Sequence, residues 1–108
     1  MIKLLALVRR RTDLTPEEFA RYWTTVHAPL AEAQGPRGYV IDIRTSAQPD
    51  GAIDDLDSVA EIWWDDHDHM TRGLTSEAGR IAAADVSNFA AEVRFVVVEP
   101  NTIVTPPA

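Results

Sequence analysis

His27 and Asp85 are the residues of this chain best suited by type and position to acid–base chemistry. His27 lies in a run of bulky residues that recur at helical spacing, so its ring should face the interior. Asp85 falls on the apolar stripe of a later helix, where an unpaired carboxylate is costly to bury. The imidazole would be a suitable partner, because the carboxylate would orient and charge it. The same pattern also fits a hydrogen-bonded core histidine and an aspartate that reaches solvent or nearby backbone.

The segment 15–30 should form the helix that carries His27. Thr15 suits the N-cap position, and Glu18, three residues later, completes a capping box. Pro29 lacks an amide proton and disfavours helical geometry in the residue before it, so we expect the helix to kink or stop just beyond His27. The side chains expected on its inner face are Phe19, Tyr22, Trp23, Val26, His27 and Leu30.

Aromatic side chains supply a candidate binding cleft. Trp63 and Trp64 are neighbours in a predicted strand and therefore point to opposite faces of the sheet. One of them should line a cleft on the helix side, together with Tyr22, Trp23 and Phe89, and the other should enter the opposite face. A cleft of this kind suits an apolar, aromatic or cyclic small molecule, although each tryptophan fits plain core packing equally well.

The order of the expected elements is strand, helix, strand, strand, helix, strand. The strands cover residues 2–9, 39–45, 58–64 and 92–99, and the second crossover divides into helices near 66–74 and 77–88. This order is typical of the ferredoxin-like α+β fold, with four antiparallel strands in one sheet. The inner stripe expected on the last helix consists of Ala78, Ile81, Ala82, Asp85 and Phe89.

The first, third and fourth strands carry apolar side chains on both faces, whereas the helices of such a fold cover only one. A second copy of the same sheet is the simplest cover for the other face, so we predict a two-fold homodimer. Residues 1–99 should form a single domain, and residues 100–108 a tail rich in proline and threonine.

The string Tyr22-Trp23-x-x-x-His27-Ala28-Pro29-Leu30 resembles the signature of the EthD family. The resemblance runs from the first strand to the last, and outside this string it rests on pattern and length. It implies a dimeric α/β-barrel fold with a small-molecule pocket between sheet and helices. It also implies proton transfer around His27, without a cofactor, on a polyketide-like or lactone substrate, as in cyclases, isomerases and dehydratases.

Other functions stay open on the same residues. Many proteins that resemble the EthD family have no defined reaction, so a non-catalytic binding or accessory protein of a degradation or biosynthetic pathway is an alternative. The same fold also hosts haem-degrading enzymes and cofactor-free monooxygenases, in which case His27 would be a candidate haem ligand. Nothing else in the sequence favours haem.

Two further clusters are candidate sites. The run from Asp65 to His69 resembles a metal cluster, but His67 and His69 are two residues apart and diverge on a helix. Capping explains aspartates at a helix start, so we predict no metal site there. The Arg9–Arg11 run could meet a substrate carboxylate at the cleft mouth, or it could meet solvent and the chain's own aspartates.

The composition narrows the range of partners. The chain has 108 residues, a formal net charge of −7 and no cysteine. An acidic surface argues against nucleic acid or an anionic membrane as the main partner, and the missing cysteines exclude disulfides and thiolate metal sites. The apolar run 2–8 is too short for a secretory signal and is followed by arginines, so we interpret it as a strand of a cytoplasmic protein.

Overall fold

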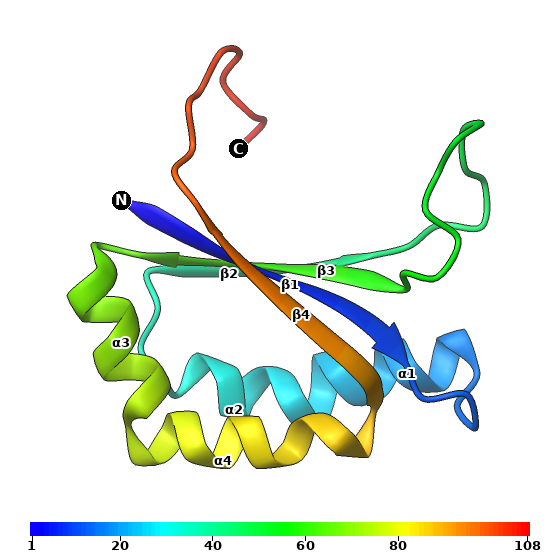
Figure 1. The fold of residues 1–108 in the computed structure, drawn as a ribbon, viewed down its shortest axis with the longest axis horizontal. Coiled ribbons are helices and arrows are strands. Elements are labelled where there is room, and N and C mark those ends of the chain that lie inside the picture. The colour runs from blue at the N-terminus through cyan, green and yellow to red at the C-terminus, as the bar shows by residue number, and fades with distance from the viewer.

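The computed structural model describes residues 1–108 as one four-stranded antiparallel sheet with helices on a single face (Figure 1). The strand order is β2-β3-β1-β4. The predicted α+β ferredoxin-like arrangement is thereby confirmed. In chain order the elements are β1 (Ile2–Arg10), α1 (Pro16–Tyr22), the π-helical turn η1 (Trp23–His27), α2 (Ala28–Glu32), β2 (Gly38–Ile43), β3 (Ser58–Trp64), α3 (His67–Thr75), α4 (Glu77–Asp85), the 3₁₀ turn η2 (Val86–Asn88) and β4 (Ala90–Val98).

The helix ends follow the capping chemistry that the sequence contains. Thr15 accepts a hydrogen bond from the Glu18 amide while the Glu18 carboxylate accepts one from the Thr15 amide, which is the predicted capping box. Asp66 caps α3 and Ser76 caps α4 in the same manner. These caps fix where the chain leaves the sheet and returns to it, so they set the position of the helical layer.

We expected the first helix to kink or stop just beyond His27, and it continues past His27, so the expectation that it stops is wrong. The Ala28 amide bonds the Trp23 carbonyl five residues back, because Pro29 cannot donate a bond and the turn widens. Thr25 completes the local bonding by donating its hydroxyl to the Arg21 carbonyl at 2.5 Å. The chain then resumes an α-helix to the end of α2.

The widened turn changes which side chains point inward. An α-helix has 3.6 residues per turn, so positions four apart drift around its axis, and a wider turn offsets that drift. Phe19, Trp23, His27 and Ala31 are accordingly all buried. Val26, which we expected on the inner face, is 45 % exposed. Ile81 of α4 is likewise 43 % exposed, because Gly79 and Ala82 occupy the inner face of that helix instead.

An aromatic cluster joins the first helix to the start of β4 and holds His27 in place. The ring centroids of Trp23 and Phe89 are 5.3 Å apart, and those of His27 and Phe89 are 4.7 Å apart. Phe19 packs edge-on against Trp23 from the previous helical turn. The His27 ring also lies edge-on to Trp23, at 6.5 Å between centroids. Such pairs add specific geometry to the burial of apolar area, so two aromatic neighbours orient the imidazole.

The opposite face of the sheet has no helix over it, and the β2–β3 connection and the C-terminal tail extend on that side (Figure 1). Strand register places Leu5, Leu7, Val59 and Trp63 on this face. Val96 of β4 lies beside Leu5 and is 46 % exposed. The expectation that these strands are apolar on both faces is therefore met in the folded chain. None of the helices is long and apolar enough to cross a membrane.

Candidate functional site

A cavity of about 460 Å³ lies between the helices and the covered face of the sheet. Apolar side chains from all four strands and from both helical crossovers form most of its wall. The lining residues are Leu4, Ala6, Val8, Trp23, His27, Ala31, Gln34, Tyr39, Ala60, Ile62, Met70, Leu74, Gly79, Ala82, Ala83, Val86, Phe89, Val93, Phe95 and Val97. The volume is within the range of small-molecule sites.

His27 is part of the cavity wall and is only 7 % exposed. Its Nδ1 lies 3.0 Å from Oδ2 of Asp85, so the pair expected from the sequence is present in the structure. A carboxylate accepts a hydrogen bond, which places the ring proton on Nδ1 and leaves Nε2 as the basic nitrogen of the neutral ring. Nε2 has no hydrogen-bond partner within the chain, so it is free to meet a molecule in the cavity.

Asp85 accepts hydrogen bonds from three side chains. Besides the His27 contact, the Tyr22 hydroxyl donates at 2.6 Å and the Asn88 amide donates at 3.0 Å. Burial opposes ionisation of Asp85, but the bonds from Tyr22, Asn88 and His27 outweigh it and hold the pKa of this carboxyl below its ordinary value. Asp85 is therefore a carboxylate at neutral pH and can stabilise a positive charge on the imidazole.

Tyr22 supports the aspartate and lies outside the cavity lining, unlike the position expected for a substrate-binding residue. Its hydrogen bond to Asp85 raises the pKa of the phenol, because losing the proton would place two negative charges together. Asn88 was not identified from the sequence. Its spacing of three residues from Asp85 on the same helical turn is the signal that could have indicated it.

The aromatic residues divide between three places. Trp23 and Phe89 line the cavity as expected. Trp64 points to the helix side but is sealed against His69 and Gly73 outside the lining. Trp63 lies on the open face, where the ammonium of Lys3 sits 5.0 Å from the centre of its ring. Neither tryptophan of β3 therefore reaches the cavity in this chain.

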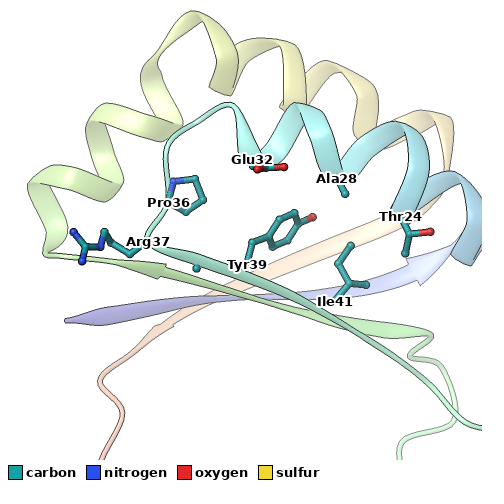
Figure 2. A pocket seen from close by; sticks show the side chains of 8 residues that line it. Thr24, Ala28, Glu32, Pro36, Arg37, Tyr39 and Ile41 are labelled. Atoms are coloured by element: carbon teal, nitrogen blue, oxygen red, sulfur yellow. The ribbon is translucent and has the colours of Figure 1, made fainter. Parts of the chain in front are cut away.

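Tyr39 is a cavity residue that sequence reasoning missed. Its hydroxyl accepts a hydrogen bond from Nε1 of Trp23 at 3.0 Å, and burial raises the pKa of the phenol. Tyr39 also lines an outer groove of about 600 Å³ between the first helix and the β2 edge (Figure 2). In that view the Tyr39 ring lies below Glu32 and beside Ile41, and Tyr39 is a lining residue of both the groove and the cavity.

The other two candidate clusters are occupied by local contacts. Arg10 bonds Asp57, Arg11 bonds Asp13, and Arg9 lies 3.5 Å from Glu92, so the arginine run meets the chain's own carboxylates. Both ring nitrogens of His69 are engaged by backbone, with the Asp65 amide at 3.0 Å and the Gly35 carbonyl at 2.9 Å. No cationic side chain lines the cavity.

Solved structures of the same fold were found in several bacteria. An EthD family protein of Bacillus halodurans is 24 % identical with a TM-score of 0.78, over 94 % of this chain and 99 % of that chain. A dimeric ferredoxin-like protein of Thermobifida fusca is 19 % identical with a TM-score of 0.69, over 90 % and 88 %. SnoaB of Streptomyces nogalater, a cofactor-independent oxygenase, is 14 % identical with a TM-score of 0.69, over 97 % of each.

These likenesses establish the fold, and the family follows from the sequence match. No curated protein sequence matches the chain. The model of the EthD domain matches residues 11–92, a range that contains the Tyr22–Leu30 string, His27 and Asp85. The chain belongs to the EthD family.

Proposed function

We propose that this protein is a cofactor-independent enzyme that transfers a proton on an enolisable carbonyl compound, with His27 as the acid and base. The observation that carries the proposal is the placement of the two ring nitrogens of His27. One nitrogen is held by an ionised Asp85 and the other is free in the wall of an apolar cavity. A positioned base in an apolar cavity is suited to the removal of a proton beside a carbonyl.

In the proposed reaction Nε2 takes a proton from the carbon next to a carbonyl group. The C–H electron pair moves into the enolate, and the imidazole becomes an imidazolium that Asp85 stabilises through Nδ1. The same proton then returns to another carbon or to an oxygen, which gives isomerisation, or assists the loss of water or the closure of a ring. His27 is thereby restored to its neutral form.

The cavity wall indicates the kind of substrate. It is apolar over most of its area and contains no arginine or lysine, so it favours a neutral compound over a carboxylate or a phosphate. Polyketide-like compounds and lactones combine such an apolar body with enolisable carbonyl groups. We therefore propose this class as the substrate of a cyclase-, isomerase- or dehydratase-type reaction.

Oxygenation without a cofactor is the second candidate. SnoaB, which has the same fold, is a cofactor-independent oxygenase. Removal of a proton from a phenol or an enol by His27 would be the shared first step, and consumption of O₂ would distinguish the two reactions. A protein that binds its ligand without turnover would show neither proton exchange nor oxygen uptake, and a haem protein would show a Soret band.

Proton exchange tests the proposal before the true substrate is known. The protein is incubated in D₂O with a panel of aryl β-diketones and unsaturated lactones, and deuterium uptake is followed by NMR. His27→Ala should reduce the catalysed exchange about a hundred- to ten-thousand-fold. Val26→Ala, at the exposed neighbouring position, is the matched control and should leave exchange unchanged. Equal exchange by folded His27→Ala protein would contradict the proposal.

We also propose that the protein acts as a homodimer joined through the open face of the sheet. That face leaves Leu5, Leu7 and Trp63 without a covering layer. The Thermobifida fusca protein with the same fold is dimeric. Two such sheets facing one another would bury these side chains by two-fold symmetry.

A further inference from the structure

One polar residue of the cavity lining, the half-buried Gln34, is not used by the proposed reaction. Four residues with polar side-chain atoms line the cavity: Trp23, His27, Gln34 and Tyr39. Trp23 and Tyr39 satisfy one another through the Nε1–H bond to the phenol oxygen. The Gln34 amide has no hydrogen-bond partner within the chain, although it can offer two donors and an acceptor.

The turn that follows α2 places Gln34 on the same wall as His27. Gln34 lies two residues beyond the last residue of α2, and it lines the cavity together with His27 and Ala31. At a rise of about 1.5 Å per residue, the backbones of His27 and Gln34 are roughly 10 Å apart along the axis. The two polar groups therefore lie toward different ends of an apolar space.

The backbone that carries Gln34 is held on two sides. Its amide nitrogen donates to the Ala31 carbonyl at 3.1 Å at the end of α2. Its carbonyl oxygen lies so close to α3 that a Cβ on Gly73 would stand 2.8 Å away, which only glycine avoids. Met70 and Leu74 of the same helix line the cavity beside it. A fixed backbone limits how far the Gln34 side chain can move, so the amide is a suitable recognition group.

We propose that Gln34 is a specificity-determining residue, which binds a neutral oxygen at the end of the substrate remote from the reacting carbon. The inference rests on the proposed function and adds the shape of the substrate to it. An amide takes a hydroxyl or carbonyl group, and no nearby cation would compensate a carboxylate. The substrate is then an elongated, apolar, uncharged molecule with an oxygen function at each end.

Equilibrium binding of simple phenols tests the proposal. The probes are 2-naphthol and 2,6-dihydroxynaphthalene, with 4-hydroxybiphenyl and 4,4′-dihydroxybiphenyl as the longer pair, and calorimetry gives each Kd. In at least one pair the wild-type protein should bind the diol about three- to tenfold more tightly than the mono-phenol, the gain expected of one added hydrogen bond. Gln34→Met, which keeps the unbranched shape, should lose that preference and keep its affinity for the mono-phenol.

The controls separate this subsite from catalysis. Gln34→Leu is the second variant if Gln34→Met does not fold, and Val26→Ala should retain the full preference for the diol. An unchanged preference in either folded Gln34 variant would overturn the proposal, as would failure of all four phenols to bind. These affinities are measured without turnover, so the two proposals can fail separately. If His27→Ala leaves proton exchange unchanged, the proposed reaction is refuted, and the preference for the diol still decides the role of Gln34.

Discussion

On the covered face of the sheet the ionisable groups form a chain of hydrogen bonds, whereas on the open face Lys3, Glu61 and Asp42 lie side by side among apolar side chains. The covered chain runs from Tyr22 through Asp85 to His27 and ends at a nitrogen in the cavity. On the open face Lys3 bonds Glu61 at 3.0 Å, and Asp42 stands next to the same carboxylate.

The comparison indicates two different uses of charge. On the covered face every donor that reaches Asp85 helps to keep it ionised, so the arrangement prepares the imidazole for a proton. On the open face Glu61 raises the pKa of Asp42 to about 6, so the two carboxyls can share one proton and lower their joint charge. A surface that neutralises its own charges is easier for a second apolar sheet to cover.

A charge placed on the open face should give the largest effect. Leu7→Glu puts a carboxylate on this face between Val59 and Arg94, where desolvation of the new charge costs several kcal/mol and an ion pair with Arg94 returns only part of that cost. We expect the dimer Kd to rise at least about a hundredfold, which corresponds to about 2.8 kcal/mol. Sedimentation velocity at micromolar concentration measures this.

Leu7→Ala is the matched control, because it shortens the side chain without adding charge and should weaken association much less. A wild-type protein that sediments as a well-folded monomer would refute the dimer directly. If Leu7→Glu still associates as tightly as wild type, the interface lies elsewhere and the open face is covered by something other than a second sheet.

The next effect concerns Asp85 on the covered face. Asp85→Asn keeps the size of the side chain but cannot stabilise an imidazolium, and its amide can hold the ring in the wrong tautomer. We expect proton exchange to fall about ten- to a hundredfold, less than for His27→Ala, because the free nitrogen remains in the cavity. Deuterium uptake on the same panel measures it, and unchanged exchange would mean that His27 acts without Asp85.

These contrasts also show which parts of the structure were predictable. The strands and caps followed from alternation and from single residues such as Thr15 and Ser76, because those signals are local. The His27–Asp85 pair followed from the cost of an unpaired buried carboxylate. The prediction of this pair needed only that both residues lie on the inner faces of helices that cover the same sheet.

The parts that sequence reasoning missed depend on contacts between distant elements. The widened turn at Trp23–His27 reflects the combined bonding of Ala28, Pro29 and Thr25, and it moved Val26 outward. The Tyr39–Trp23 bond joins a strand to a helix and has no spacing signature. One of the two tryptophans of β3 was expected to line the cleft, and Trp64, on the helix side, does not, because α3 seals its ring off from the cavity.

Tyr22→Phe should produce a smaller effect on the covered face. It removes one donor from Asp85, so the pKa of that carboxyl should move upward toward its ordinary value. Since the pKa of Asp85 is lowered in the folded state, its favourable contribution is present above the unfolded pKa and is lost as pH falls through the folded pKa. In Tyr22→Phe the folded pKa lies nearer to the unfolded pKa, so the pH-dependent loss should be smaller and should be complete at a higher pH.

We expect Tyr22→Phe to lower the free energy of unfolding by about 1 kcal/mol at pH 7, the typical net worth of one hydrogen bond. Proton exchange should fall only a few fold, because Asn88 and His27 still contact the carboxylate. Urea unfolding between pH 3 and pH 7 measures the first quantity. Equal unfolding profiles for wild type and variant would show that Tyr22 does not help to keep Asp85 ionised.

The smallest expected effect is the pH dependence of the open face. Because Asp42 has a folded pKa of about 6, raised by Glu61 and by burial, the folded chain binds a proton that the unfolded chain releases near the ordinary aspartate pKa of 3.8. Stability should therefore increase as pH falls from 7 toward 5, while Glu61, whose pKa is lowered by Asp42 and Lys3, stays ionised. Asp42 is exposed in the chain, so solvent screening keeps the change below about 1 kcal/mol. Asp42→Asn should remove this increase in stability, measured by urea unfolding at pH 5, 6 and 7, and should keep the loss of stability at lower pH that belongs to Asp85.

If the increase in stability persists in Asp42→Asn, another group titrates between pH 5 and pH 7. The sharing of a proton between Asp42 and Glu61 would then no longer support the proposal that a second sheet covers the open face.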